Sequence, residues 1–279
     1  MKKYTFENVR DFNLKHIFEC GQCFRWMPEA DGSGDYTGAA GSYAARVSYD
    51  RDNSLLSIEA TGGEKDFWRE YFDLGTDYAA IKEKLTDSEP KIAKAVKYGS
   101  GIRILNQDLF ETLISFIVSQ NNNIPRIRKC IESLCRRYGE YIGEAFGSEW
   151  HAFPAPEVLA CADVQDIMDL RLGYRSRYIR EAAEQYVSDC RAGNLPCTRE
   201  EILSYCGVGP KVANCIMLFG LRCTDAFPVD TWVRHIMNDM YGIEKSDAKG
   251  MESFACEKFG SLAGYAQQYL FYYYRDNDK

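Results

Sequence analysis

The sequence predicts an α+β protein in which a small antiparallel β-rich region precedes a larger all-helical region. Residues 43–49 and 55–59 are rich in strand-forming side chains and flank the turn-forming segment 50–53, as in a β-hairpin. From about residue 98 onward, apolar residues recur at helical spacing. The composition, with 46% hydrophobic and 27% charged residues, is that of a folded globular chain.

The boundary between the two regions is placed at residue 97. Residues 1–97 are predicted to form an antiparallel β domain with short helices, and residues 98–279 the helical region. One helix ends at the asparagines 121–123, and Pro125 starts the next. Further helices are predicted at residues 156–171, 175–192, 198–206, 210–221, 231–241, 248–258 and 261–275.

Several classes of protein are disfavoured by composition. No stretch approaches the ~18 uncharged apolar residues that a membrane span needs, and no apolar segment follows Lys2 and Lys3 as in a signal peptide. We therefore expect a protein with no membrane partner, located in the cytoplasm (nucleoid) of a prokaryote, or in the nucleus or mitochondrion of a eukaryote. A monomer is the expected oligomeric state.

The cysteines and charges narrow the possible partners. Of 11 cysteines only Cys20 and Cys23 have the CxxC spacing, so a four-ligand metal site is not expected. The net charge of −7 disfavours nucleic acid over the whole surface. Locally, however, residues 102–138 hold six Lys or Arg against three acids, and residues 171–180 hold four arginines and no acid. The acidic net charge is therefore compatible with a local basic face.

The most informative segment is a glycine-rich turn within a predicted helix–hairpin–helix at about residues 199–221. Gly207 and Gly209 bracket Val208, and Pro210 stands where the next helix begins. Such a turn lets backbone amides approach a phosphate at the positive end of a helix. This predicts a sequence-independent contact with the DNA backbone. The alternative is a plain corner between two helices of a bundle.

Lys211 and Asp230 are the candidate catalytic residues. Lys211 lies in the first turn of the second hairpin helix, where desolvation favours the neutral, nucleophilic amine. Asp230 precedes the predicted helix 231–241, which can bring its carboxylate to the same cleft. Taken alone, Asp230 is better explained as a helix N-cap than as a catalytic residue.

These features together resemble a known superfamily. The segment 203–236 closely resembles the helix–hairpin–helix and aspartate signature of DNA glycosylases, and a lysine at position 211 resembles the subset that also cleaves the strand. Four further blocks resemble the human-type 8-oxoguanine DNA glycosylase/AP lyase family, and they lie at residues 21–26, 116–126, 172–178 and 264–271.

The resemblance implies a mechanism. Lys211 would attack C1′ of a flipped-out 8-oxoguanine nucleotide, expel the base and form a Schiff base, after which β-elimination nicks the strand. Asp230 would stabilise the positive charge that develops on the sugar. The implied partner is double-stranded DNA with 8-oxoguanine opposite cytosine.

The resemblance also assigns the damaged-base pocket. Gly21 would offer its carbonyl to N7–H, Gln267 would bind the Watson–Crick edge, Phe271 would stack on the base, and Cys215 would pack against it. From the residues alone these are a strand-edge glycine, a surface glutamine, a core phenylalanine and a small buried cysteine.

A second set is implied for the opposite strand. Asn121 would fill the gap left by the flipped base, Arg126 and Arg175 would bind the orphaned cytosine, and Tyr174 would wedge beside it. Without the resemblance, the asparagine is a helix cap and the arginines are solvated charges.

Two departures and two alternatives accompany this prediction. Trp232 stands where histidine is frequent in the family, and Cys206 where proline is common. No cofactor is expected, although Ca²⁺ or Mg²⁺ can sit at the hairpin carbonyls when DNA is bound. The alternatives are a related glycosylase with another damaged-base preference and a non-catalytic helix–hairpin–helix DNA-binding module.

Overall fold

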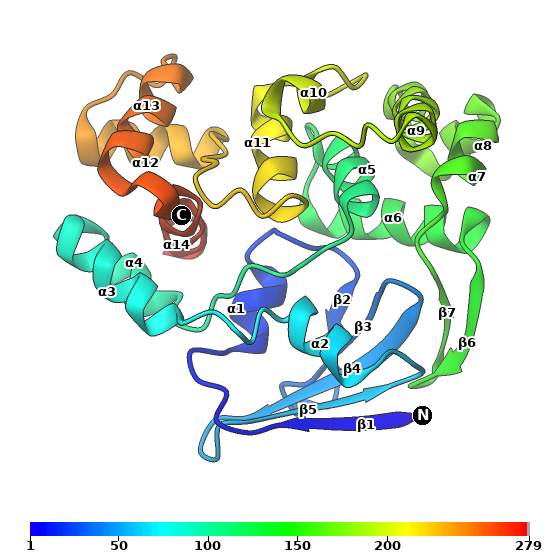
Figure 1. Cartoon of the computed structure of the whole chain (residues 1–279), viewed down its shortest axis with the longest axis horizontal. Coiled ribbons are helices and arrows are strands. Elements are labelled where there is room, and N and C mark those ends of the chain that lie inside the picture. Colours follow the sequence, from blue (N-terminus) through cyan, green and yellow to red (C-terminus); the bar gives the residue numbers. More distant parts are fainter. Residues whose placement is uncertain (278–279) are drawn as a thin grey trace.

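The computed structural model describes residues 1–277 and shows a twisted antiparallel sheet beside a larger set of helices (Figure 1). The sheet has the strand order β1-β5-β4-β3-β2. Its strands are β1 (Lys2–Phe6), β2 (Trp26–Pro28), β3 (Tyr36–Ala40), β4 (Tyr43–Asp50) and β5 (Leu55–Ala60). The predicted α+β class is confirmed.

The predicted hairpin is the centre of this sheet. β4 and β5 pair antiparallel, with Val47 opposite Ile58 and Asp50 opposite Leu55. Within the turn, the Asp50 carboxylate accepts the N–H groups of Asp52 and Asn53 at 3.0 and 3.1 Å. Side chain–backbone bonds of this kind define Asx turns, which explains why the strands reverse here.

Two helices cover one face of the sheet. They are α1 (Leu14–Glu19) and α2 (Lys65–Tyr71), and both contribute to one buried cluster with the strands. In that cluster Phe18 stacks on Trp26 with ring centroids 4.4 Å apart, and the Trp26 indole N–H donates to the Tyr71 hydroxyl at 2.7 Å. The sheet region therefore has its own hydrophobic core.

Two helices from the N-terminal part pack with the helical region instead. These are α3 (Tyr78–Ser88) and α4 (Ala93–Tyr98), joined by η1 (Pro90–Ile92). Their buried side chains, such as Leu85 and Val96, belong to the same cluster as Tyr269 of α14 (Ala263–Asn277). The boundary predicted at residue 97 thus falls in the last turn of α4, and both α3 and α4 share the core of the helical region.

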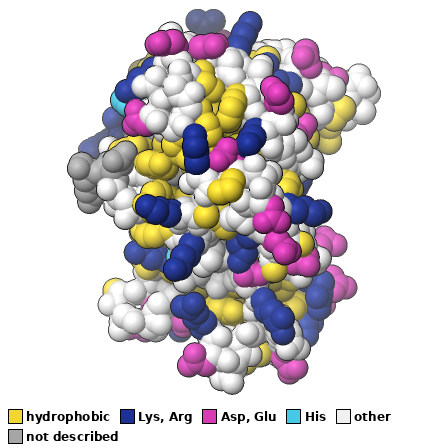
Figure 2. Space-filling model, turned by 90° about the vertical axis from the view of Figure 1, so that its left-hand side faces the viewer, with side chains coloured by type: hydrophobic (Ala, Val, Ile, Leu, Met, Phe, Trp, Pro, Cys, Tyr) yellow, Lys and Arg dark blue, Asp and Glu magenta, His cyan; other side chains and the backbone are white. Residues whose placement is uncertain are grey.

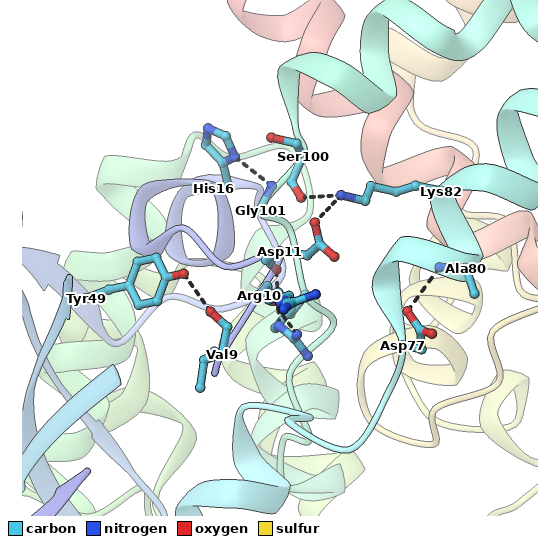
Figure 3. Close-up of polar contacts among 11 residues, drawn as sticks. Val9, Arg10, Asp11, His16, Tyr49, Asp77, Ala80, Lys82, Ser100 and Gly101 are labelled. Atoms are coloured by element: carbon cyan, nitrogen blue, oxygen red, sulfur yellow. Dashed lines mark hydrogen bonds and ion pairs between the residues drawn. The ribbon is translucent and has the colours of Figure 1, made fainter. Parts of the chain in front are cut away.

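A polar joint connects the N-terminal segment to α3 and to the loop after α4 (Figure 3). Lys82 forms an ion pair with Asp11, and the Gly101 N–H donates to Nδ1 of His16 at 3.2 Å. The Arg103 guanidinium donates to the backbone carbonyl just before Asp11 at 2.7 Å. These bonds fix the position of α1, and hence of the loop that follows it, against the helical core.

The helical region follows the predicted pattern closely. Its remaining elements are α5 (Leu109–Ser119), α6 (Ile124–Tyr138), α7 (Pro156–Cys161), α8 (Val164–Ile167), η2 (Met168–Leu172), α9 (Arg175–Ala192), α10 (Arg199–Leu203), α11 (Pro210–Phe219), α12 (Thr231–Tyr241), α13 (Ala248–Phe259) and η3 (Gly260–Leu262). The helix predicted at 156–171 is broken, because Ala162 is extended (ψ 143°) and Asp163 caps a new helix. Arg171 then adopts a left-handed φ of 65°.

The expectation of an all-helical region is wrong at residues 141–151. There β6 (Tyr141–Ala145) and β7 (Ser148–His151) form a two-stranded hairpin, with a register shift between Tyr141 and Gly143. β6 approaches β4 of the main sheet, so packing between regions far apart in sequence favours these strands. Their short, irregular pattern gives little local signal.

The face that carries α3, α4 and α13 has mixed charge. Figure 2 shows Lys and Arg side chains interspersed there with Asp and Glu and with apolar patches. This face is therefore not a continuous cationic surface. Within residues 1–277, no helix is long and apolar enough to cross a membrane, and no group of His, Cys, Asp and Glu is arranged to hold a metal ion.

Candidate active site

A pocket of about 40 Å³ lies where the loop after α1 meets α5, α11 and α14. It brings together every residue predicted for catalysis and for binding the damaged base, although they come from four separate segments. Its lining residues are Cys20, Gly21, Phe116, Lys211, Cys215, Phe219, Pro228, Asp230, Gln267, Gln268 and Phe271.

Lys211 projects from the first turn of α11. The helix begins at Pro210 with Gly209 as its N-cap, so the local sequence fixes where the lysine emerges. Lys211 is half-buried, and its Nζ lies 5.4 Å from the centroid of the Phe116 ring. One turn along, burial raises the pKa of the Cys215 thiol, and the nearby Lys211 charge opposes that shift. Cys215 is therefore a protonated, packing side chain.

Asp230 serves both as a cap and as a wall of the pocket. Its Oδ1 accepts the N–H of Val233 at 2.8 Å, which makes it the N-cap of α12. Burial raises the pKa of this carboxyl above its ordinary value, while the Val233 N–H and the Lys211 charge act in the opposite direction. None of the ion pairs found within residues 1–277 joins Asp230 to Lys211. The Lys211 charge thus acts on the Asp230 carboxyl without a salt bridge between the two side chains.

The hairpin glycines differ in what surrounds them. Gly207 has a φ of +79°, and a Cβ there would lie 2.6 Å from the Tyr178 ring. A Cβ at Gly209 would meet nothing within 4 Å. The Gln120 amide donates to the Gly207 carbonyl at 2.9 Å and ties the hairpin to the end of α5. Gly207 is thus required by the fold, whereas Gly209 faces open space.

The base-binding residues lie on α14 and on the loop after α1. Gln267 is buried at 3% exposure, so the alternative of a surface glutamine is wrong. Phe271 is half-buried and lies beside Gly21, since a Cβ on Gly21 would sit 3.4 Å from the Phe271 ring. The φ of +83° at Gly21 also disfavours a side chain there. Gly21 and Phe271 face each other across the pocket.

Three of the four residues predicted for the opposite strand, Asn121, Tyr174 and Arg175, come together, and Arg126 contacts the carbonyl of Arg171 instead. The Asn121 amide donates to the Tyr174 hydroxyl at 3.4 Å, and the Arg175 guanidinium lies 4.6 Å from the Tyr174 ring centroid. Arg126 is exposed, whereas Arg175 is only 5% exposed and donates to the carbonyls of Gln120 and Asn121. In the free protein Arg175 therefore holds the loop that carries Asn121.

Sequence reasoning missed several members of the site. Gln268 lines the pocket beside Gln267, and Gln120 braces the hairpin. Both lie within blocks that carried the family resemblance, but nothing in their local pattern separates them from surface residues. Phe116 has the spacing of an apolar helix face in the sequence, and its position against Lys211 depends on helix packing.

Comparisons with known proteins agree with this geometry. Residues 5–113 match the 8-oxoguanine DNA glycosylase N-terminal domain, and residues 114–261 match the HhH-GPD superfamily base excision DNA repair protein. An N-glycosylase/DNA lyase from Saccharomyces cerevisiae is 31% identical over 95% of this chain and 84% of that protein. A probable N-glycosylase/DNA lyase from Methanothermobacter thermautotrophicus is 35% identical over 72% of this chain and 70% of that protein.

Solved structures extend the likeness to three dimensions. The Clostridium acetobutylicum 8-oxoguanine glycosylase/lyase, in complex with double-stranded DNA containing cytosine opposite 8-oxoguanine, superimposes with a TM-score of 0.90. It is 39% identical, over 99% of this chain and 96% of that one. MBOgg1, in complex with a low-affinity DNA ligand, gives a TM-score of 0.91 at 41% identity, over 100% and 97% of the two chains.

A lysine and an aspartate in one pocket beside a helix–hairpin–helix define the class, which is that of base excision DNA glycosylases. Within that class, the chain belongs to the 8-oxoguanine DNA glycosylase family and is a bifunctional N-glycosylase/DNA lyase.

Proposed function

We propose that this protein removes 8-oxoguanine opposite cytosine from double-stranded DNA and then cleaves the strand, with Lys211 as nucleophile. The observation that carries the proposal is the single pocket that holds Lys211, Asp230, Gly21, Gln267 and Phe271. A non-catalytic DNA-binding module would not need this convergence of four segments on a half-buried lysine and aspartate.

The proposed chemistry begins with covalent catalysis. The Lys211 amine uses its lone pair to form a bond to C1′, while the C1′–N9 bond breaks and its electron pair leaves with the base. The Asp230 carboxylate stabilises the positive charge on the sugar at that moment. Opening of the sugar ring gives a Schiff base. Loss of a 2′ proton and cleavage of the C3′–O3′ bond then nick the strand.

Base recognition is proposed for the groups around Lys211. The Gly21 carbonyl accepts the N7–H that oxidised guanine carries and guanine lacks, Gln267 binds the Watson–Crick edge, and Phe271 stacks on the base. With a volume of about 40 Å³, the pocket is far smaller than a usual ligand site of about 300–1,000 Å³. Phe271 must therefore move away from Gly21 when the base enters.

Opposite-base recognition is proposed for Asn121, Arg126, Tyr174 and Arg175. Arg126 is exposed and free to reach cytosine, and Tyr174 is exposed for stacking. Arg175 must exchange at least one of its carbonyl partners if it is to bind the orphaned base. Gly207 and Gly209 would bring the hairpin backbone to a phosphate.

The other expectations stay predictions. The reaction as written needs no cofactor, and Ca²⁺ or Mg²⁺ is proposed only as a bridge between hairpin carbonyls and DNA. A monomer acts on each lesion. The protein is predicted to reside with the DNA, in the nucleoid of a prokaryote or in the nucleus or mitochondrion of a eukaryote.

Borohydride trapping tests the proposal. With a duplex carrying 8-oxoguanine opposite cytosine, the wild type should give a covalent protein–DNA adduct, and Lys211→Gln should give none. Base release that persists in Lys211→Gln would instead point to attack by water. An adduct that forms only with another damaged base would indicate the related glycosylase.

A further inference from the structure

A second, larger cavity lies apart from the base pocket, between α6, β2, β7 and η2. Its volume of about 770 Å³ is in the range of ligand sites. Six cations and two carboxylates line it, and they are Arg25, Arg126, Arg128, Lys129, Arg136 and Arg171 with Glu132 and Glu149. Within residues 1–277, Arg25 is the only one of these cations that forms an ion pair. The cavity therefore has an excess of unneutralised positive charge.

Arg25 is the buried floor of this cavity, at 8% exposure. Its Nη2 donates to the His151 carbonyl, but its Nε and Nη1 have no hydrogen-bond partner. The Oε2 atom of Glu111 lies 3.9 Å from the Arg25 Nη1. Burial raises the pKa of the Glu111 carboxyl to about 7. Glu111 is thus a weak counter-ion near neutral pH. A buried guanidinium in this state favours an anion from outside.

The remaining wall is apolar and partly aromatic. Phe24, Trp150 and Leu170 line this wall. Beside them, the buried Nε of Arg128 has no hydrogen-bond partner, as is also the case for Nε of Arg25. An anion with a flat apolar body satisfies both surfaces, because its phosphate meets the guanidinium groups and its ring packs on the aromatic side chains. Nucleotides have this chemistry.

We propose that this cavity binds a nucleotide, supplied by the DNA strand opposite the lesion. The source follows from Arg126, which lines the cavity and is also one of the residues proposed to bind the opposite base. Its Nη2 donates to the carbonyl of Arg171, another residue of the cavity wall, at 3.4 Å. The choice of the DNA strand rests on the proposed function, whereas the choice of nucleotide chemistry rests on the cavity alone.

Two cavity variants and a matched control test this site. Arg136→Gln and Trp150→Leu change the cavity wall, whereas Arg137→Gln changes a neighbouring arginine that pairs with Asp166 at 3.6 Å outside it. We expect both cavity variants to weaken binding of an 8-oxoguanine:cytosine duplex at least threefold and Arg137→Gln to leave it unchanged. Because a phosphate contact is lost, Arg136→Gln should also flatten the salt dependence of binding.

The second arm titrates free dCMP and inorganic phosphate by calorimetry. Binding of dCMP that the cavity variants abolish, with duplex affinity unchanged, would assign the cavity to free nucleotides and overturn the strand as the source. If neither dCMP nor the duplex responds to these variants, the nucleotide site is wrong. Borohydride trapping by the wild type shows independently whether the proposed function holds.

A separate observation concerns Gln268 in the base pocket. Gln268 is 3% exposed, and its Nε2 donates to Oε1 of Gln267 at 2.7 Å. Its own Oε1 is buried without a partner. Since this side chain lines the pocket, the structure assigns Gln268 as a positioning residue that orients the Gln267 amide through the bond from its Nε2. Its unpartnered Oε1 is left as an acceptor for the amino group of the base.

The test uses the two substrates of the proposed function. Gln268→Met keeps the volume but removes the donor and the acceptor, so kcat/KM on 8-oxoguanine:cytosine should fall about tenfold or more. Cleavage of a duplex with a preformed abasic site should stay unchanged, because no base is read there. Gln268→Glu, which retains only acceptors when ionised, should not restore excision.

A wild-type rate of excision in Gln268→Met would overturn this role, and so would an equal fall with both substrates, which would indicate a structural effect. Failure of the wild type itself to excise 8-oxoguanine would count against the proposed function instead.

Discussion

Asp230 shows how one side chain can hold two roles. Its carboxylate caps α12 through the Val233 N–H and also lines the pocket with Lys211. The two roles can be separated by substitution, because asparagine caps a helix about as well as aspartate and alanine does not.

We expect Asp230→Asn to unfold with nearly wild-type free energy, and Asp230→Ala to lose about 1 kcal/mol, since only alanine removes the cap. Both should lower the rate of base excision by about 10²–10³-fold, because both remove the negative charge. Chemical denaturation and single-turnover kinetics measure the two effects. Excision by Asp230→Asn at the wild-type rate would show that the cap alone matters.

The Asp230 carboxyl should also set the pH below which the rate of base excision falls, which is the acid limb of the pH profile. Burial raises the pKa of Asp230 in the folded protein, so the active carboxylate becomes protonated at a higher pH than an ordinary aspartate does. Activity should therefore fall as pH drops through this raised pKa. A pH profile of single-turnover excision checks this, with Asp230→Asn as the variant in which the limb disappears. A limb retained in Asp230→Asn would place it on another group.

At the scale of elements, the hairpin depends on two glycines for different reasons. Gly207 has a left-handed φ and no room for a Cβ beside Tyr178, whereas Gly209 has a φ of −95° and open space around it. One glycine is needed for folding and the other is available for a close approach by DNA.

Gly207→Ala should destabilise the protein by about 1–3 kcal/mol, because both the φ and the ring of Tyr178 oppose a side chain. Gly209→Ala should cost less than about 1 kcal/mol as an N-cap change, yet weaken duplex binding, because its methyl group stands where a phosphate would lie. Thermal unfolding and DNA-binding isotherms distinguish the two. Equal DNA affinity in Gly209→Ala and wild type would argue against the phosphate contact.

Sequence patterns predicted most elements because the signals were local. The β4–β5 hairpin is specified by Asp50 and its turn, and α11 by Pro210 after Gly209. The β6–β7 hairpin was missed because its stability comes from contact with β4, which no local pattern records.

At the scale of the whole molecule, the base pocket depends on the joint between the sheet region and the helices. Gly21 follows α1, and α1 is held by the bond between His16 and the Gly101 N–H and by the neighbouring bonds of Lys82 and Arg103 (Figure 3). Loosening this joint should displace one wall of the pocket.

The joint should be sensitive to pH through His16. Burial lowers the pKa of His16 below its ordinary value, and the charges of Lys15 and Arg51 add to this shift. The unfolded chain therefore binds the proton more readily, so the stability that neutral His16 provides is complete above about pH 6.5 and is lost as pH falls below it. The free energy of unfolding measured from pH 7.5 to 5.5 should fall more in wild type than in His16→Gln.

Subtracting the two curves isolates His16, because other titrating groups such as Glu111 are present in both proteins. Parallel curves would mean that His16 titrates alike in the folded and unfolded states.

The sequence by itself determined the α+β class and most of the elements, because turn residues and helical periodicity are local in the chain. Through the family motifs it also predicted the site residues Lys211, Asp230, Gly21, Gln267 and Phe271. Only the tertiary structure decided that these residues share one small pocket, that Asp230 avoids a salt bridge with Lys211, and that Gln268 and the cavity floored by Arg25 exist at all. Those properties arise from burial and from distances between segments far apart in sequence, and packing of the whole chain sets both.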